Sequence, residues 1–128
     1  EFKKAIEINP RYASAYHNLG LTYRVIGNME EALKNYKLAL NINPNLWQSH
    51  QNLADIYMLQ KNYPLTIQEL QEAIKSNPQD SILHLNLGVV YIMLNEKDKA
   101  KKELNLALQL DPQNEKAKKA LIELTLSH

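Results

Sequence analysis

Two histidines are the residues best suited to metal binding or proton transfer in this sequence. His50 and His84 are 34 residues apart, and Tyr16 lies one such interval earlier. An imidazole can hold zinc or exchange a proton near neutral pH. However, packed helices lie about 8–10 Å apart, and no carboxylate shares the helical stripe expected to carry these histidines. We therefore predict that both are packed side chains in place of an aromatic ring, and not metal ligands.

The sequence lacks the motifs of common catalytic and cofactor sites. It contains no cysteine, which excludes disulfides, thiolate catalysis and cysteine-type zinc sites. It also has no glycine-rich phosphate loop, no His-Glu-x-x-His motif, and no Ser, His and Asp set that its spacing would bring together. We predict no catalytic residue, no metal ligand and no cofactor, and hence a protein that is not an enzyme.

Three asparagines share the 34-residue spacing: Asn18, Asn52 and Asn86. An asparagine amide carries a donor and an acceptor, so a row of amides could bind successive peptide groups of an extended ligand. Each such hydrogen bond contributes about 0.5–1.5 kcal/mol, enough to anchor a ligand but not to select it. The alternative is a structural role in helix capping or helix-to-helix hydrogen bonding.

Charge and hydropathy exclude two classes of partner. Fifteen Lys and Arg nearly balance fourteen Asp and Glu, so no net field attracts nucleic acid or an anionic membrane. The acidic residues Asp98, Glu103 and Glu115 lie within or next to the lysine-rich segments 97–102 and 116–119, as expected of a solvated helix face. No apolar run approaches the roughly 18 residues that span a bilayer. We expect a soluble chain, with the cytoplasm favoured, that neither binds nucleic acid nor inserts into membranes.

Several residue types follow the same period of 34 residues, which indicates a tandem repeat. Proline recurs four times, always after Asn or Asp, and tyrosine, leucine, alanine and small residues recur in phase with it. The series are Pro10, Pro44, Pro78, Pro112; Tyr23, Tyr57, Tyr91; Leu19, Leu53, Leu87; Gly20, Ala54, Gly88; and Ala5, Ala39, Ala73, Ala107. Each proline ends a helix and turns the chain into the next repeat.

Each period is expected to contain two amphipathic helices. Apolar and small residues recur at i, i+3, i+4 and i+7, the spacing of one helical stripe. The first helix has this stripe at Tyr16, Leu19, Gly20 and Tyr23, and the second runs through Ala32, Tyr36, Ala39 and Leu40. Turns are predicted at 27–28 and 61–62. The small residues lie where the two helices of a pair approach most closely.

This pattern resembles the tetratricopeptide repeat family, whose 34-residue repeat has conserved aromatic, Leu, Gly, Tyr, Ala and Pro positions. Residues 13–46 match it throughout, with Tyr16, Leu19, Gly20, Tyr23, Ala32, Tyr36, Ala39 and Pro44. The resemblance implies an all-α, right-handed solenoid of stacked antiparallel helix pairs, one domain over residues 1–128. We divide it into the second helix of a truncated repeat (1–12), repeats at 13–46, 47–80 and 81–114, and a capping helix or degenerate repeat (115–128).

The resemblance also implies a concave groove lined by the first helix of each pair, on the face opposite the core stripe. We predict a scaffold that binds a neutral or apolar peptide, or an amphipathic segment of a partner protein, in this groove. The predicted peptide-binding residues are His17, Asn18, Leu21, Gln48, Gln51, Asn52, Asp55, Ile82, Leu85, Asn86, Val89 and Met93. Ile82, Leu85, Val89 and Met93 form an apolar patch that is expected to contact the partner.

Other members of the family suggest further roles. Chaperone adaptors grip a C-terminal carboxylate with Lys and Arg, but the corresponding surface here is uncharged apart from the nearby Arg24, so we expect no such clamp. The asparagine row resembles that of the O-linked N-acetylglucosamine transferase family, which leaves open a substrate-targeting arm of a larger enzyme, such as a glycosyltransferase. Self-association through Phe2 and Ile6, at the truncated N-terminal end, is a further alternative.

Overall fold

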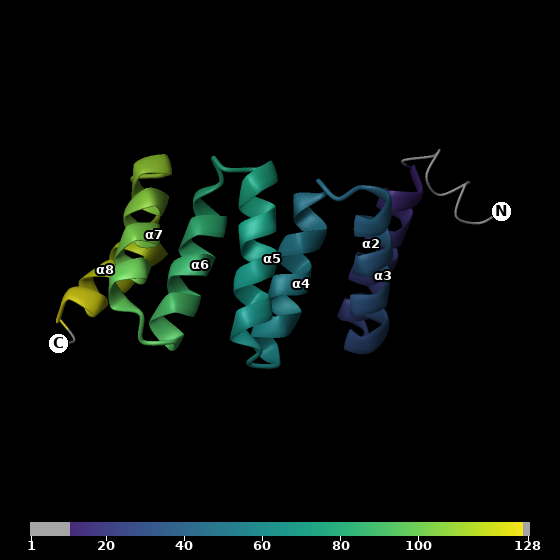
Figure 1. Cartoon of the computed structure of the whole chain (residues 1–128), viewed down its shortest axis with the longest axis horizontal. Helices are drawn as coiled ribbons and strands as arrows, with labels where there is room; N and C mark the ends of the chain where they lie inside the picture. Colours follow the sequence, from purple (N-terminus) through teal and green to yellow (C-terminus); the bar gives the residue numbers. More distant parts are fainter. Residues whose placement is uncertain (1–10, 127–128) are drawn as a thin grey trace.

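The structure, a computed structural model, describes residues 11–126, and this part of the chain forms seven helices and no strand. The helices are α2 (Arg11–Val25), α3 (Met29–Ile42), α4 (Trp47–Leu59), α5 (Tyr63–Ser76), α6 (Ser81–Met93), α7 (Lys97–Leu110) and α8 (Glu115–Leu126). Figure 1 shows them stacked in chain order, with α2 and α3 at one end and α8 at the other. The predicted all-α solenoid of helix pairs is confirmed. The truncated repeat at 1–12 falls almost wholly outside the described residues, as do Phe2 and Ile6.

Polar side chains fix where four of the helices begin. Asn28 and Asn62 lie 34 residues apart, and each side-chain oxygen accepts a hydrogen bond from a backbone N–H in the first turn, that of Glu31 at 3.2 Å and Leu65 at 3.4 Å. Asp80 and Asn114 do the same for α6 and α8. Such caps satisfy N–H groups that have no partner within the helix.

The turn inside each helix pair needs one residue with positive φ. Gly27, Lys61 and Asn95 occupy this place at 34-residue intervals, with φ angles of 87°, 59° and 59°. Glycine adopts this conformation without steric cost, asparagine tolerates it, and lysine does so with some strain. The positive φ at all three turns keeps the pairs equivalent even where the residue type changes.

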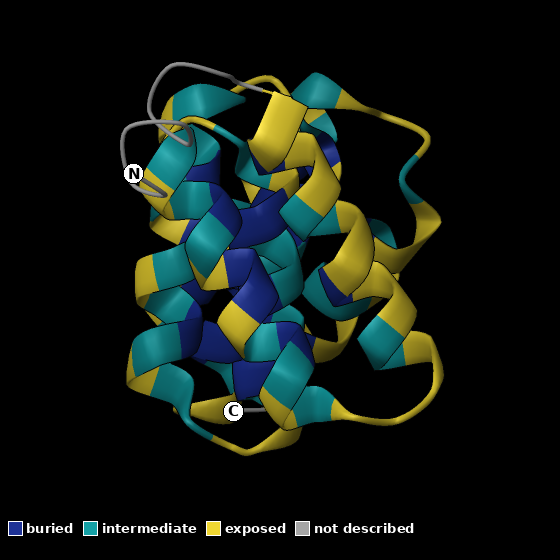
Figure 2. Cartoon of the chain, turned by 90° about the vertical axis from the view of Figure 1, so that its right-hand side faces the viewer, coloured by how far each residue is buried: buried dark blue, intermediate teal, exposed yellow. Residues whose placement is uncertain are grey.

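The core runs through the middle of the helix stack, where Figure 2 shows the buried residues, and it extends both within and between helix pairs. Ala39, Ala73 and Ala107 are fully buried. Gly20 faces Tyr36, and a Cβ atom at Gly20 would lie 2.6 Å from the Tyr36 ring. Two repeats later along the chain, a Cβ at Gly88 would lie 3.0 Å from the Leu104 side chain. The small residues therefore set how closely the paired helices approach.

Leu19 departs from the expected core stripe. Leu53 and Leu87 are 1% and 3% exposed, whereas Leu19 is 45% exposed. Leu53 belongs to α4, which packs on α3, and Leu87 belongs to α6, which packs on α5. Within the described residues no helix precedes α2. The same stripe position is thus buried only where the second helix of a preceding pair covers it.

Candidate functional site

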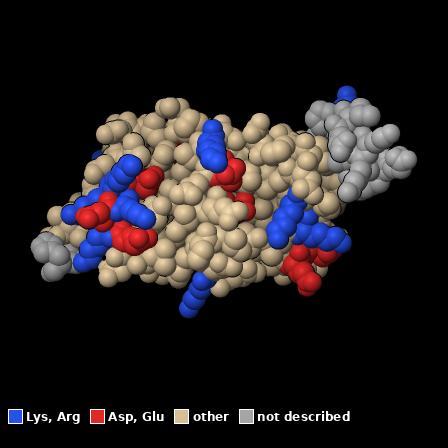
Figure 3. All heavy atoms as spheres, in the orientation of Figure 1, with Lys and Arg blue, Asp and Glu red and all other residues tan. Residues whose placement is uncertain are grey.

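The first helices of the pairs, α2, α4 and α6, are almost without charge. Arg11, Arg24 and Asp55 are their only charged residues, and α6 has none. The second helices α3, α5 and α7 carry Lys and Glu or Asp in mixed groups, which lie on the face seen in Figure 3. We call the exposed side of α2, α4 and α6 the first-helix face. It carries the residues predicted to bind a partner.

One polar bridge crosses this face between α2 and α4. The guanidinium of Arg24 donates from Nη1 to Asn52 Oδ1 at 2.7 Å and to Asp55 Oδ2 at 3.4 Å. Burial raises the pKa of the Asp55 carboxyl, and the neighbouring Arg24 partly opposes this shift. The bridge neutralises the charged groups in the middle of the face.

The three asparagines of the predicted row have different environments. Asn52 accepts from Arg24, and its own NH₂ group donates to the Gln48 carbonyl at 2.8 Å. Its amide is therefore used in holding helices together. Asn18 is exposed on α2. Among the described residues none hydrogen-bonds the half-buried Asn86 amide, which lies in the wall of two cavities. Asn86 is the member of the row best placed to bind a ligand.

His17 is held against the core at the N-terminal end of the face. Its Nδ1 lies 2.8 Å from the hydroxyl of the buried Ser49, which joins α2 to α4. Its ring packs on Tyr36 with centroids 5.6 Å apart. Burial lowers the pKa of His17, which favours the neutral imidazole. A packing role accounts for these contacts.

Exposure on α6 corrects one of the predicted contacts. Ile82 and Met93 are 53% and 55% exposed and Val89 is half-buried, but Leu85 is only 6% exposed and belongs to the core. The α8 helix packs against both α6 and α7, and the buried Ala117 and Leu124 of α8 share the Leu85 core cluster. Leu85 is therefore largely covered and is not one of the exposed residues of the patch, although it lies in the wall of a hollow beside Ile82 and Lys116.

His50 and His84 lie in matched, buried hydrogen-bond networks. His50 Nδ1 is 2.7 Å from Glu69 Oε1 and its Nε2 is 3.0 Å from the Pro44 carbonyl. His84 repeats this geometry with Glu103 at 2.8 Å and the Pro78 carbonyl at 3.1 Å. Each histidine thus ties a first helix to its second helix and to the preceding turn.

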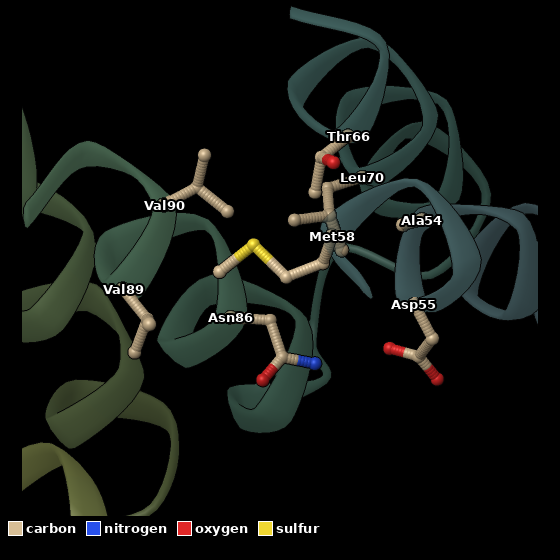
Figure 4. A pocket seen from close by; sticks show the side chains of 8 residues that line it. All are labelled: Ala54, Asp55, Met58, Thr66, Leu70, Asn86, Val89 and Val90. Atoms are coloured by element: carbon tan, nitrogen blue, oxygen red, sulfur yellow. The ribbon is translucent and has the colours of Figure 1, made fainter. Parts of the chain in front are cut away.

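A cavity of 80 Å³ opens among α4, α5 and α6, mainly beside apolar side chains. Figure 4 shows the Met58 side chain extending from α4 across the gap towards Val89, Val90 and Asn86 of α6. The remaining lining residues are Ala54, Asp55, Thr66 and Leu70. A second hollow of 310 Å³ lies beyond α6, beside Ile82, Asn86 and Lys116. The two hollows meet at Asn86.

Within residues 11–126, no group of three or more His, Cys, Asp or Glu side chains is placed to hold a metal ion. In the same part of the chain, no helix is long and apolar enough to cross a bilayer.

The family follows from sequence comparison. A family model of the tetratricopeptide repeat matches residues 57–124, and a second one matches residues 13–46. The chain belongs to the tetratricopeptide repeat family. No curated protein sequence matches it significantly.

Solved structures show the same tetratricopeptide fold. The first such domain of Spaghetti (RPAP3), bound to the HSP90 peptide SRMEEVD, aligns with a TM-score of 0.85 at 21% identity over 91% of this chain and 93% of that one. The Arabidopsis OM64 domain gives 0.83 at 20% identity over 91% and 96%. MamA gives 0.83 at 23% identity over 96% and 72%. At these identities the likeness is one of fold.

Several residues of the tetratricopeptide face and core were missed by sequence reasoning. Glu69 and Glu103 have the same 34-residue spacing as the histidines that they contact, so a search for paired series on the two helices would have found them. Met58 and Thr66, in the cavity wall, belong to no series with a constant residue type. That the predicted residues bind a partner remains a prediction.

Proposed function

We propose that this tetratricopeptide chain is a non-catalytic scaffold that binds a peptide segment of a partner protein along its first-helix face. The supporting observation is a set of exposed, uncharged side chains on three successive helices. Leu21 of α2, Gln48 of α4 and Ile82 of α6 are all exposed, and none of them belongs to either core cluster. Apolar side chains left accessible next to free amide groups are typical of interaction surfaces.

The structural neighbours support a peptide as the ligand class. The first tetratricopeptide domain of Spaghetti (RPAP3) is described with an HSP90 peptide, and the second domain of human RPAP3 with an HSP70 peptide. We expect this chain to prefer a different kind of peptide. On its first-helix face, Arg24 is already paired with Asp55, so a neutral or apolar segment should bind better than an acidic one.

The proposal is tested by selecting binders and then placing a charge on the face. Random 12-residue peptides displayed on phage are selected against the 128-residue chain, and the affinity of the best synthetic peptide is measured by fluorescence anisotropy. Ile82→Glu should weaken binding at least about tenfold, because a carboxylate replaces an apolar contact. Ile122→Glu is the matched control, since Ile122 is 59% exposed but lies on α8.

Two results would contradict the proposal. One is a selection that enriches no peptide above the level obtained with an unrelated helical protein. The other is a selected peptide that binds Ile82→Glu and Ile122→Glu as tightly as the unsubstituted chain. Circular dichroism of both variants should match that of the parent, because each substituted side chain is more than half exposed.

A further inference from the structure

The cavity among α4, α5 and α6 has walls suited to an aliphatic group. Met58, Leu70, Val89 and Val90 are among the residues that line it. Figure 4 shows the Met58 side chain running across the gap between α4 and α6. Methionine has three rotatable bonds and adapts to different neighbours. The cavity can therefore adjust its width to an entering side chain without moving the helices.

The volume of the cavity limits the size of that group. It measures 80 Å³, whereas an apolar cavity of about 150 Å³ accepts benzene with its six carbon atoms. Three or four carbon atoms therefore fill the space. This is the size of a valine, isoleucine or leucine side chain and is too small for an aromatic ring.

The charges at the cavity favour an uncharged occupant. Asp55 is the one ionisable residue in the lining, and Arg24 already pairs with it at 3.4 Å. An acidic side chain would be repelled by Asp55, whose pKa is already raised by burial. A basic side chain would compete with Arg24 and would lose its hydration against the apolar walls. An aliphatic side chain incurs neither cost.

Asn86 provides a polar contact at the entrance. It lies between the cavity and the larger hollow beside Ile82 and Lys116. Asn52, its equivalent one repeat earlier, has both ends of its amide bonded within the protein. Asn86 keeps a donor and an acceptor for the main chain of a ligand whose side chain enters the cavity.

We propose that this cavity is a specificity pocket for one short aliphatic side chain of the bound peptide, with the Asn86 amide binding the main chain beside it. The inference rests on the proposed function, since it names what that peptide must carry. It predicts a preference for valine, isoleucine or leucine at one position and rejection of glycine, charged residues and aromatic residues there.

Methionine methyl signals report on the pocket directly. The chain has three methionines, of which Met58 lines the cavity, while Met29 begins α3 and Met93 ends α6. The 128-residue chain labelled with ¹³C-methyl methionine is titrated with N-acetyl-valine N-methylamide. The Met58 methyl and the Asn86 side-chain amide should shift saturably, with Met29 unchanged. The glycine and aspartate analogues should bind at least about tenfold more weakly.

Substitutions in the wall separate the pocket from the rest of the face. Val89→Phe should fill the cavity and abolish the Met58 shift, whereas Val25→Phe, at a site 85% exposed on α2, should leave it intact. Met58→Ala enlarges the cavity, so the shift of the Asn86 amide should then be larger with the phenylalanine analogue than with the valine analogue. This reversal also tests the pocket if Val89→Phe does not fold.

Failure of this inference differs from failure of the proposed function. If selected peptides bind in an Ile82-dependent manner, but valine fragments leave Met58 unchanged and Val89→Phe binds peptides normally, the pocket assignment is wrong and the scaffold stands. If no peptide is selected at all, the proposed function fails. Equal shifts of Met58 by the glycine and valine analogues would also overturn the pocket.

Discussion

At the scale of single residues, histidine at the aromatic position of repeat two makes part of the stability dependent on pH. Burial disfavours the charged form of His50, but the hydrogen bonds to Glu69 and to the Pro44 carbonyl, with the nearby Glu69 and Glu72 charges, raise its pKa overall. His17 has the opposite shift, because burial lowers its pKa and Ser49 offers no charge. The two residues should therefore impose opposite slopes on the stability curve.

The pH dependence follows from these signs. Because the pKa of His50 is raised on folding, its contribution is complete below the unfolded value near 6.5 and is lost as the pH rises through the folded pKa. His17 lowers stability as the pH falls below about 6.5, because only the unfolded chain gains the proton readily. We expect a maximum of the free energy of unfolding near that pH, measured by urea denaturation between pH 5 and 9.

Single substitutions separate the two contributions. His50→Gln should remove the decline above pH 6.5 and destabilise the chain by about 1.5–3 kcal/mol at pH 6, because Glu69 loses a charged partner. His17→Gln should remove the fall in the free energy of unfolding below pH 6.5 and leave its dependence on pH above 6.5 unchanged. A decline above pH 6.5 that persists in His50→Gln would show that another group causes it.

At the scale of helix pairs, the close contact between Gly20 and Tyr36 makes the residue type tolerated at position 20 depend on the residue type at position 36. A Cβ at Gly20 would meet the Tyr36 ring at 2.6 Å, and this ring is fully buried. The equivalent pair in repeat two is Ala54 with Leu70, and both are 1% exposed. Tyr36 on the second helix thus requires glycine on the first, whereas Leu70 of repeat two leaves room for alanine.

This coupling predicts a rescue. Gly20→Ala should destabilise the chain by about 1–2 kcal/mol, because an overpacking cost of about 1–3 kcal/mol exceeds the gain in helix propensity. Adding Tyr36→Leu, which recreates the Ala54 and Leu70 pair, should recover most of that loss relative to Tyr36→Leu alone. A double-mutant cycle by thermal and urea unfolding measures the coupling, and strictly additive effects would contradict it.

The helices and turns could be predicted from the sequence because each repeat carries the same local signals. Pro, Asn and Gly at fixed spacing define the ends, and the small and aromatic residues define the packed stripe. Burial was harder to predict at the ends of the array. The periodicity predicts that Leu19 is in the core and that Leu85 is on the surface. Instead, Leu19 is exposed and Leu85 is buried, because their exposure depends on which helix packs next to them.

At the scale of the whole molecule, the distribution of charge matters more than the net charge of +1. Charges are concentrated on the second helices and on α8, and the first helices are left with Arg11, Arg24 and Asp55. The sequence places the residues of the candidate site on the first helices, although Leu85 is buried and not exposed. The pairing of Arg24 with Asn52 and Asp55 could not be predicted from the sequence. It joins residues of two different repeats, and no other pair of repeats carries the same residues at these positions.

This distribution predicts a preference against acidic peptides. The peptide SRMEEVD should bind at least about tenfold more weakly than its counterpart SRMQQVN with a C-terminal amide, which carries no negative charge, because Arg24 is the cation between α2 and α4 and is already paired with Asp55. Asp55→Asn should free Arg24 and so reduce the difference in affinity between the two peptides severalfold. Added salt should weaken this improvement in the binding of SRMEEVD. Fluorescence anisotropy with both peptides measures these effects. Tighter binding of SRMEEVD by the unsubstituted chain would show that the face selects negative charge and that an uncharged partner is the wrong assignment.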